Sequence, residues 1–348
     1  MATAPLVQPW RRWVRAHPLQ AALSLLGLVL GVYLLLPAID WAILKADFRG
    51  ADRSACDSGG ACWVFVKVRI EQFMLGFYPS ELAWRPLLTL GLWLLGMVPL
   101  FWHHMPGRWI VVPLQFLLLP FLSWAVLDGS WLGWERIESA RWGGLLLTLL
   151  IASIGISLSL PLGILLALGR RSRLPVIKWL AVSFIEVWRG VPLIAVLFMA
   201  SVMLPLFLPP GVEIDKLLRC LVGVTLFTSA YMAEVIRGGL QAIPKGQYEA
   251  AAALNLSFFQ TMGLVILPQA LRKVIPGIVN TFIGLFKDTS LVLIVGMFDL
   301  LGMVQAASTD PEWLGMAMEG YVFAGFVFWL FSFAMSRYSL RLEQRLQH

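Results

Sequence analysis

The sequence predicts an all-α integral membrane protein with about eight transmembrane helices. Of its 348 residues, 59% are hydrophobic and only 14% are charged, and the mean hydropathy is +0.79. Soluble domains carry a charge at about a quarter of their positions, so this composition excludes an ordinary soluble domain. Apolar runs long enough to cross a bilayer recur along the chain, with short polar segments between them.

The first three predicted spans lie within residues 1–142. They cover residues 19–39, 86–102 and 109–127, and a polar segment at 40–84 separates the first two. Residues 128–142 are polar and rich in tryptophan, which favours a helix lying flat at the membrane interface.

Five more predicted spans follow within residues 143–348. They cover residues 143–168, 176–208, 217–236, 275–301 and 321–335. A polar segment precedes the fourth of these, and Gly246 begins an alanine-rich stretch within it. Residues 249–254 are all strong helix formers, so we expect a short helix there. By composition alone, this stretch is a solvated loop between helices.

Lysine and arginine orient the predicted spans. The net charge is +7, but the basic residues sit between apolar runs and not on one face, a pattern that does not suggest nucleic-acid binding. The spans put the basic N-terminus, Arg108, residues 170–173, residues 237–273 and the C-terminal tail on one side, which the positive-inside rule makes cytoplasmic. We therefore expect both termini in the cytoplasm and residues 40–84 outside.

The outer segment holds two of the three cysteines. Cys56 and Cys62 flank a Gly-Gly loop, and in an oxidising compartment they could form a disulfide or stay as free thiols. A metal site would need a second ligand pair that the segment lacks. Cys220 lies in an apolar run and is expected to be a buried hydrophobe. The adjacent His103 and His104 are expected in a solvated turn.

The alanine-rich stretch resembles the EAA loop of ABC-importer permeases. That loop has Glu-Ala-Ala, three residues, a glycine, nine residues and then Ile-x-Leu-Pro. Here the match covers residues 246–270 and begins at Glu249, with Asn255 at the glycine position and Val265 at the isoleucine position. Asparagine tolerates a left-handed backbone better than most residues, so the turn can survive.

From Gly143 on, the chain resembles the polar-amino-acid family of ABC permeases. The matching stretches are residues 144–149, 185–193, 230–239, 246–270, 276–280 and 285–291. Val191 departs from the threonine that the family usually has. The resemblance implies that the five C-terminal helices form a type I importer permease core with a cytoplasmic coupling helix. Residues 1–142, an extension with three spans, look like the longer permease of the general L-amino-acid branch.

Several charged residues fall inside predicted spans, where charges are costly and usually face a cavity or a partner. Glu186 and Arg189 are three apart, so they share a helix face and can pair. Arg189 and the pair Lys287 and Asp288 lie at similar depths on two predicted helices. One interpretation is that opposite charges on the two helices form buried ion pairs that fix helix register. The other, which the resemblance favours, is that they line the path of an amino acid and meet its carboxylate and ammonium groups. The candidate substrate-binding residues are Glu186, Arg189, Lys287, Asp288, Thr289 and Ser290. Glu234 and Arg237 repeat the Glu-xx-Arg pattern at the end of another span, where a surface ion pair explains them.

The resemblance also implies the mechanism and the partners. No Gly-xxxx-Gly-Lys-Ser/Thr loop is present, so the chain is not itself an enzyme, carries no cofactor, and leaves ATP and Mg to a partner ATPase. The ATPase-coupling residues are Gly246, Glu249, Ala250, Ala251, Leu254 and Asn255. The expected partners are two ATP-binding subunits, a second and different permease, an extracytoplasmic amino-acid-binding protein and the lipids of a bacterial inner membrane.

Three other functions fit the sequence less well. An ion-gradient-driven secondary transporter would show mirrored halves with broken helices, which are not seen. A membrane enzyme would need a metal-ligand cluster or a nucleophile with its base. A non-transporting assembly subunit would leave the EAA loop without a role.

Overall fold

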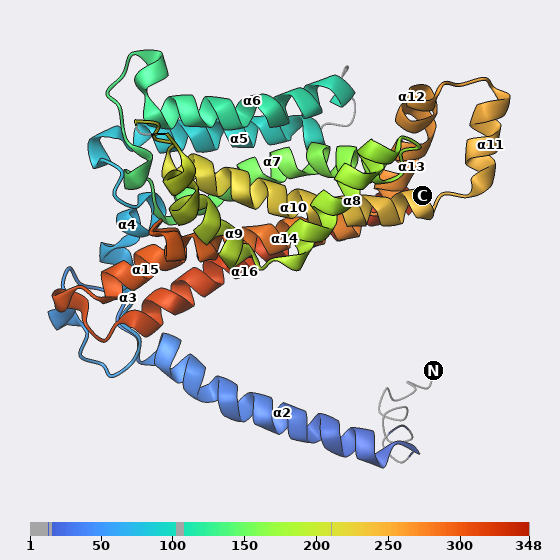
Figure 1. Cartoon of the computed structure of the whole chain (residues 1–348). Helices are drawn as coiled ribbons and strands as arrows, with labels where there is room; N and C mark the ends of the chain where they lie inside the picture. The colour runs from blue at the N-terminus through green and yellow to red at the C-terminus, as the bar shows by residue number, and fades with distance from the viewer. Residues whose placement is uncertain (1–12, 14–15, 102–107, 210, 348) are drawn as a thin grey trace. The chain divides into compact units, whose positions relative to one another are not determined.

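The computed structural model describes residues 13, 16–101, 108–209 and 211–347. The basic residues 11 and 12 and the turn with His103 and His104 lie outside these ranges. Throughout the described ranges the fold is helical, and β-pairing is limited to isolated bridges (Figure 1). The contacts divide the chain into one unit of residues 1–68 and 311–319 and a second of residues 69–310 and 320–348.

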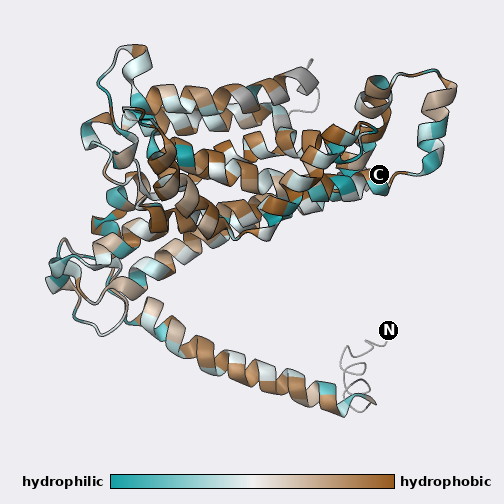
Figure 2. Cartoon of the chain, in the orientation of Figure 1, coloured by the Kyte–Doolittle hydropathy of each residue, from teal (hydrophilic) through white to brown (hydrophobic). Residues whose placement is uncertain are grey.

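The first unit begins with α2 (Pro18–Ile39), which continues as a π-helical turn, Asp40–Leu44. No residue of α2 is buried, and hydrophobic residues occupy most of its length (Figure 2). Residues 45–68 form a loop with a 3₁₀ turn (Arg53–Ala55) and the short helix α3 (Trp63–Val68), and residues 311–319, which include the start of α16 (Ala317–Gln347), complete the unit. A disulfide joins Cys56 to Cys62 in this loop, with 5.5 Å between their Cα atoms. The unit thus consists of one apolar helix followed by a polar segment that a disulfide cross-links.

The second unit starts with α4 (Ile70–Leu75) and the hairpin of α5 (Trp84–Phe101) and α6 (Arg108–Asp128). The two hairpin helices pack side by side (Figure 1), and the Trp93 indole donates a hydrogen bond of 2.9 Å to the Ser123 hydroxyl between them.

The predicted interfacial helix at 128–142 is wrong. This segment is an extended loop with two single 3₁₀ turns, Ser130–Leu132 and Ser139–Arg141. Gly129 and Gly133 have φ values of +83° and +73°. A left-handed residue ends a right-handed helix, so two such glycines break the segment into turns.

The centre of the second unit is the pair α7 (Gly144–Arg170) and α10 (Lys216–Gln241). Their contact depends on small residues, because a β-carbon on Gly163 would lie only 2.7 Å from Met232. Leu147 and Ile151 of α7 pack against Val224 of α10 in the largest buried apolar cluster. Close packing of this kind fixes α7 and α10 as a rigid frame.

The predicted span at 176–208 is not one straight helix. It consists of α8 (Pro175–Gly190) and α9 (Leu193–Phe198), which continues in short turns to Phe207, and the two parts are bent by 102°. Val191 is extended, with φ −107° and ψ 134°. The cause is Pro192, since a residue before proline is disfavoured in helical geometry and proline itself has no N–H to donate.

The remaining helices complete the unit. After α10 come α11 (Lys245–Ala253), α12 (Phe258–Gln260), a π-helical turn and α13 (Leu267–Lys273). Then follow α14 (Ile275–Asp288), a 3₁₀ segment (Thr289–Val295), α15 (Leu300–Ser308) and α16 (Ala317–Gln347). In Figure 1, α11 stands apart from the bundle at one end.

The helices confirm the predicted fold class. Six described helices are long and apolar enough to cross a membrane, and the bent pair α8 and α9 makes a seventh. The one remaining predicted span, residues 109–127, corresponds to α6, in which Leu114–Asp128 forms a shorter apolar helix.

Candidate functional site

The predicted coupling segment forms a helix and a turn at one end of the bundle. α11 includes Gly246, Glu249 and Ala250, all exposed, while Ala251 is 2% exposed and faces the protein. The helix ends at Ala253, and the chain turns at Asn255, the only described non-glycine residue with a left-handed backbone, at φ 54°. The Asn255 N–H donates to the Ala252 carbonyl at 2.9 Å. Asparagine therefore does what a glycine would do at this position.

Four residues that the sequence analysis did not name as site residues hold this segment in place. The Arg171 guanidinium lies 5.5 Å from the centre of the Tyr248 ring and donates to its hydroxyl at 2.9 Å. The Gln269 amide donates to the side-chain oxygen of Gln247 at 3.0 Å. A tyrosine within an alanine run and an arginine at the end of α7 were the available signals. These contacts tie α11 to α7 and α13.

The outer surface of the segment is apolar to an unusual degree. Leu254 is 75% exposed and Phe259 84% exposed, and Phe258 and Leu264 are exposed as well. A capping box between Ser257 and Gln260 fixes the start of α12, so the two phenylalanines are presented from a defined turn. Exposed aromatic clusters on an ordered element mark a surface for another protein or a membrane.

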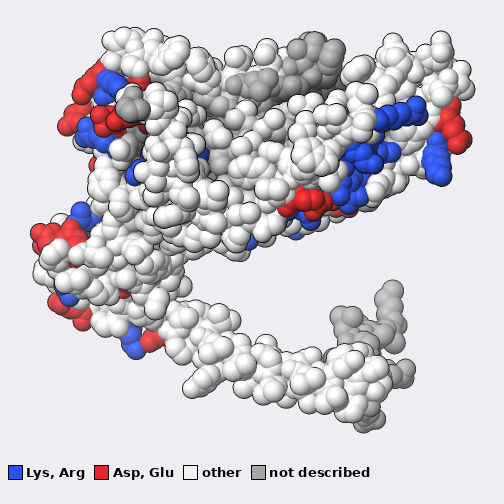
Figure 3. All heavy atoms as spheres, viewed as in Figure 1, with Lys and Arg blue, Asp and Glu red and all other residues white. Residues whose placement is uncertain are grey.

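A network of charges connects α7, α8 and α10 toward the same end of the bundle, where lysine, arginine and acidic residues gather (Figure 3). Glu234 of α10 accepts from Arg170 at 2.7 Å and from Arg237 at 2.8 Å, and Arg189 lies 3.8 Å away. Glu186 pairs with Arg170 at 3.0 Å. The structure thus gives Glu186 and Arg189 separate partners on α7 and α10, and Glu234 and Arg237 form more than a surface pair.

The other four predicted substrate residues lie at the end of α14. Lys287 is exposed and Asp288 half-buried, whereas Thr289 is fully buried. The hydroxyls of Thr289 and Ser290 donate to backbone carbonyls at 2.8 and 2.9 Å. In the described ranges, no hydrogen bond or ion pair joins these four residues to Glu186 or Arg189. The two candidate sets are therefore separate clusters.

Metal-ion ligation finds no support in the part of the chain that the structure describes. It contains no group of three or more His, Cys, Asp or Glu side chains placed to hold a metal ion. Cys220 is buried in α10, as expected of a small hydrophobe.

Comparisons with known proteins agree with this geometry. The sequence profile of the family described as the binding-protein-dependent transport system inner membrane component matches residues 159–348. The inner membrane amino-acid ABC transporter permease protein YhdY of Escherichia coli is 57% identical over 309 residues, covering 89% of this chain and 84% of that protein. The glutamate/glutamine/aspartate/asparagine transport system permease protein BztC of Rhodobacter capsulatus is 39% identical, covering 97% of this chain and 93% of its own.

A solved structure supports the same assignment. The crystal structure of an amino acid ABC transporter with histidines matches with a TM-score of 0.52 and 29% identity, covering 58% of this chain and 92% of that one. The profile match spans more than half of the chain, and the two relatives match across most of their length. The chain therefore belongs to the family of inner-membrane components of binding-protein-dependent transport systems, the permease subunits of ABC importers.

Proposed function

We propose that this chain is a permease subunit of an ATP-driven amino-acid importer in a bacterial inner membrane. Residues 246–270 would dock on a separate ATPase, which holds the ATP and Mg. Amino-acid cargo is supported by the relatives, because YhdY, BztC and the solved transporter are all described as amino-acid transporters.

The observation that carries the coupling role is the construction of α11. The helix stands outside the bundle, yet Arg171, Tyr248 and Gln269 anchor it to α7 and α13. If a partner displaces a helix that is anchored in this way, the bundle moves with it. A flexible loop would instead change shape without moving the bundle. Exposed Ala250 allows close contact with a partner, and Glu249 offers a carboxylate to a basic residue across the interface.

The remaining assembly follows from that docking. The α11 end of the bundle lies in the cytoplasm together with both termini, and residues 40–84 lie outside. Two ATP-binding subunits would contact this permease and a second, different one, and their closure would shift the pair between outward- and inward-facing states. An extracytoplasmic binding protein would deliver the amino acid. Glu186, Arg189 and the Lys287–Ser290 cluster are proposed contacts along its path.

Charge reversal at the coupling helix tests this proposal. Glu249→Lys is expected to lower ATP-driven amino-acid uptake by about tenfold or more in proteoliposomes of the assembled transporter, because it places a cation against a basic partner surface. Membrane insertion should be unchanged, since Glu249 is exposed.

The control is the same reversal at exposed Glu81, which lies outside residues 246–270. Normal uptake by Glu249→Lys would refute the docking role. Uptake by the parent protein under an ion gradient alone, without ATP, would instead establish a secondary transporter.

A further inference from the structure

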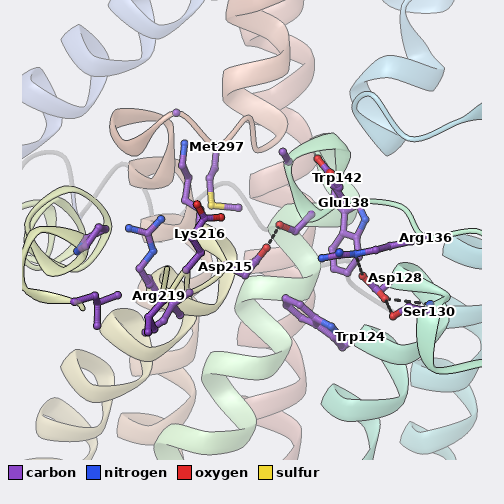
Figure 4. Close-up of a pocket in the computed structure, with 18 of the residues that line it drawn as sticks. Trp124, Asp128, Ser130, Arg136, Glu138, Trp142, Asp215, Lys216, Arg219 and Met297 are labelled. Atoms are coloured by element: carbon purple, nitrogen blue, oxygen red, sulfur yellow. Dashed lines mark hydrogen bonds and ion pairs between the residues drawn. The ribbon is translucent and has the colours of Figure 1, made fainter. Parts of the chain in front are cut away.

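A cavity of about 810 Å³ opens at the end of the second unit opposite α11. One wall comes from residues 205–208 and 212–215 and from Lys216 and Arg219 at the start of α10, whereas α11 follows the end of α10 (Figure 1). The other wall is the end of α6 and the 128–142 loop (Figure 4). The cavity is thus built jointly by the N-terminal extension and the permease core.

Both signs of charge line this cavity. Its cations are Arg136, Lys216 and Arg219, and its acids are Asp128, Glu138, Glu213 and Asp215. Two of these acids, Asp128 and Asp215, already have polar partners within the protein. Asp128 accepts from the Ser130 N–H at 3.1 Å and lies 3.5 Å from Arg136, and Asp215 caps α10 at Leu218 while accepting from the Ser139 hydroxyl. The bond between Ser139 and Asp215 ties the loop wall to the α10 wall (Figure 4).

Other charged side chains on the two walls have polar groups available for a ligand. Lys216 on α10 and Glu138 on the loop are exposed, and neither side chain has a hydrogen bond or ion pair among the residues that the structure describes. Arg219 donates from one terminal nitrogen to the Ser201 carbonyl, but its Nε is buried without a partner. The α10 wall therefore offers cationic donors and the loop wall offers a carboxylate.

Aromatic rings form the rest of the loop wall. Trp124 and Trp142 lie edge to face with 5.3 Å between ring centres, and Trp131 also lines the cavity. Tryptophan supplies a large apolar surface that accepts side chains of many shapes. Cavities of roughly 300–1,000 Å³ are the usual size of small-ligand sites.

We propose that this cavity is an outer binding site for zwitterionic α-amino acids. Lys216 and Arg219 would bind the carboxylate and Glu138 the ammonium, and the tryptophan wall would contact the variable side chain. The charged contacts address groups that all α-amino acids share, so the site would select for the zwitterion and little for the side chain. The inference rests on the proposed amino-acid cargo.

The coverage of the relatives places one wall of this site outside the common core, whereas Lys216 and Arg219 lie within it. The family profile begins at residue 159, after Trp124, Glu138 and the rest of the loop wall. The two long relatives match 89% and 97% of this chain, whereas the solved amino-acid transporter matches 58%. The outer site is therefore a property of permeases that carry the extension.

Saturation-transfer NMR on the assembled transporter in nanodiscs tests the site without the binding protein. The probes are L-glutamine, glutaramate, which lacks the ammonium, and γ-aminobutyramide, which lacks the carboxylate. Lys216→Gln is expected to weaken L-glutamine and glutaramate by about fivefold and to leave γ-aminobutyramide unchanged, because one exposed charge contact is lost. Glu138→Gln is expected to weaken L-glutamine and γ-aminobutyramide by a similar factor and to leave glutaramate, which has no ammonium, unchanged.

Matched controls lie beside the cavity. Glu135→Gln and Arg141→Gln change exposed charges of the same loop that do not line it, and both should leave all three probes unchanged. Amino-acid uptake in the presence of the binding protein is measured in parallel. A transporter that carries no amino acid would contradict the proposed function. Normal uptake with no probe bound, or equal loss of all three probes in one variant, would overturn the outer site. Loss of binding-protein affinity with unchanged probe signals would also overturn it and identify a docking surface.

Discussion

At the residue scale, Glu234 shows that the energetic contribution of a charged side chain depends more on its ion-pair partners and its burial than on the spacing of charges in the sequence. Its side chain is only 16% exposed and meets three guanidinium groups, whereas that of Glu186 is 54% exposed and meets one. Water screens the exposed pair, so its net contribution is small. The Glu-xx-Arg spacing correctly put Glu186 and Arg189 on one helix, but their partners come from α7 and α10, which no local pattern specifies.

Replacing the two glutamates separately tests this difference. Glu234→Gln should lower the free energy of unfolding by about 2–4 kcal/mol, because it leaves three clustered cations without their shared carboxylate. Glu186→Gln should cost less than about 1 kcal/mol. Denaturant titration of the purified permease measures both, and equal losses for the two variants would contradict the argument.

Asp299 is a buried acid outside the spanning segments. Its side chain accepts from the Gly302 N–H at 3.0 Å, but the second carboxyl oxygen is buried without a partner. Burial raises the pKa of this carboxyl from 3.8 to about 6. The folded chain therefore holds the proton more tightly than the unfolded chain between these pH values.

The sign of the resulting pH dependence follows. The contribution of protonated Asp299 is fully present below its unfolded pKa and is lost as the pH rises through about 6. Asp299→Asn should thus gain stability relative to the parent protein from pH 5 to pH 8, by about 1–1.5 kcal/mol, because part of the contribution is already lost between pH 3.8 and pH 5. Thermal unfolding midpoints across this range measure the effect. Parallel curves for the two proteins would show that Asp299 does not titrate there.

At the scale of elements, hydrophobic length predicted the helices and missed their interruptions. Each predicted span overlaps helical segments, because about twenty apolar residues have few alternatives in a membrane. The breaks after Gly190 and in the 128–142 loop arise from single residues, Pro192 and the left-handed glycines. Hydropathy averages over such residues. The turn at Asn255 was predictable, because the motif marked one position where left-handed geometry is needed.

That turn can be tested directly. Asn255→Gly should leave the stability and activity of the permease near those of the parent, whereas Asn255→Val should cost about 1–2 kcal/mol, because a β-branched residue resists positive φ. The turn lies at the end of α11, so the loss should appear as faster proteolysis within residues 245–260 and reduced ATP-driven uptake. Equal behaviour of the two variants would show that the backbone at this position is adaptable.

At the scale of the whole molecule, the sequence predicted the proposed coupling segment but not the outer cavity at the other end. The coupling segment is continuous in the chain, so one motif specified it. The outer cavity draws on the end of α6, the 128–142 loop and α10, segments far apart in sequence. Its lining depends on where the extension packs against the core, which no single stretch encodes. The Lys287–Ser290 cluster is intermediate, since its residues are contiguous but their roles depend on burial.

Measuring amino-acid uptake by the assembled transporter distinguishes a substrate contact from a structural role for residues of the Lys287–Ser290 cluster. Lys287 is exposed and available to a passing carboxylate, whereas the Thr289 hydroxyl is buried and donates to the Phe286 carbonyl. Lys287→Gln should therefore reduce uptake by about tenfold with unchanged assembly, because one charged contact to the cargo is lost. Thr289→Val should mainly lower the unfolding temperature. Exposed Lys178 on α8 provides the control substitution to glutamine. If Lys287→Gln instead yields unfolded protein, its charge fixes helix packing and the substrate role fails.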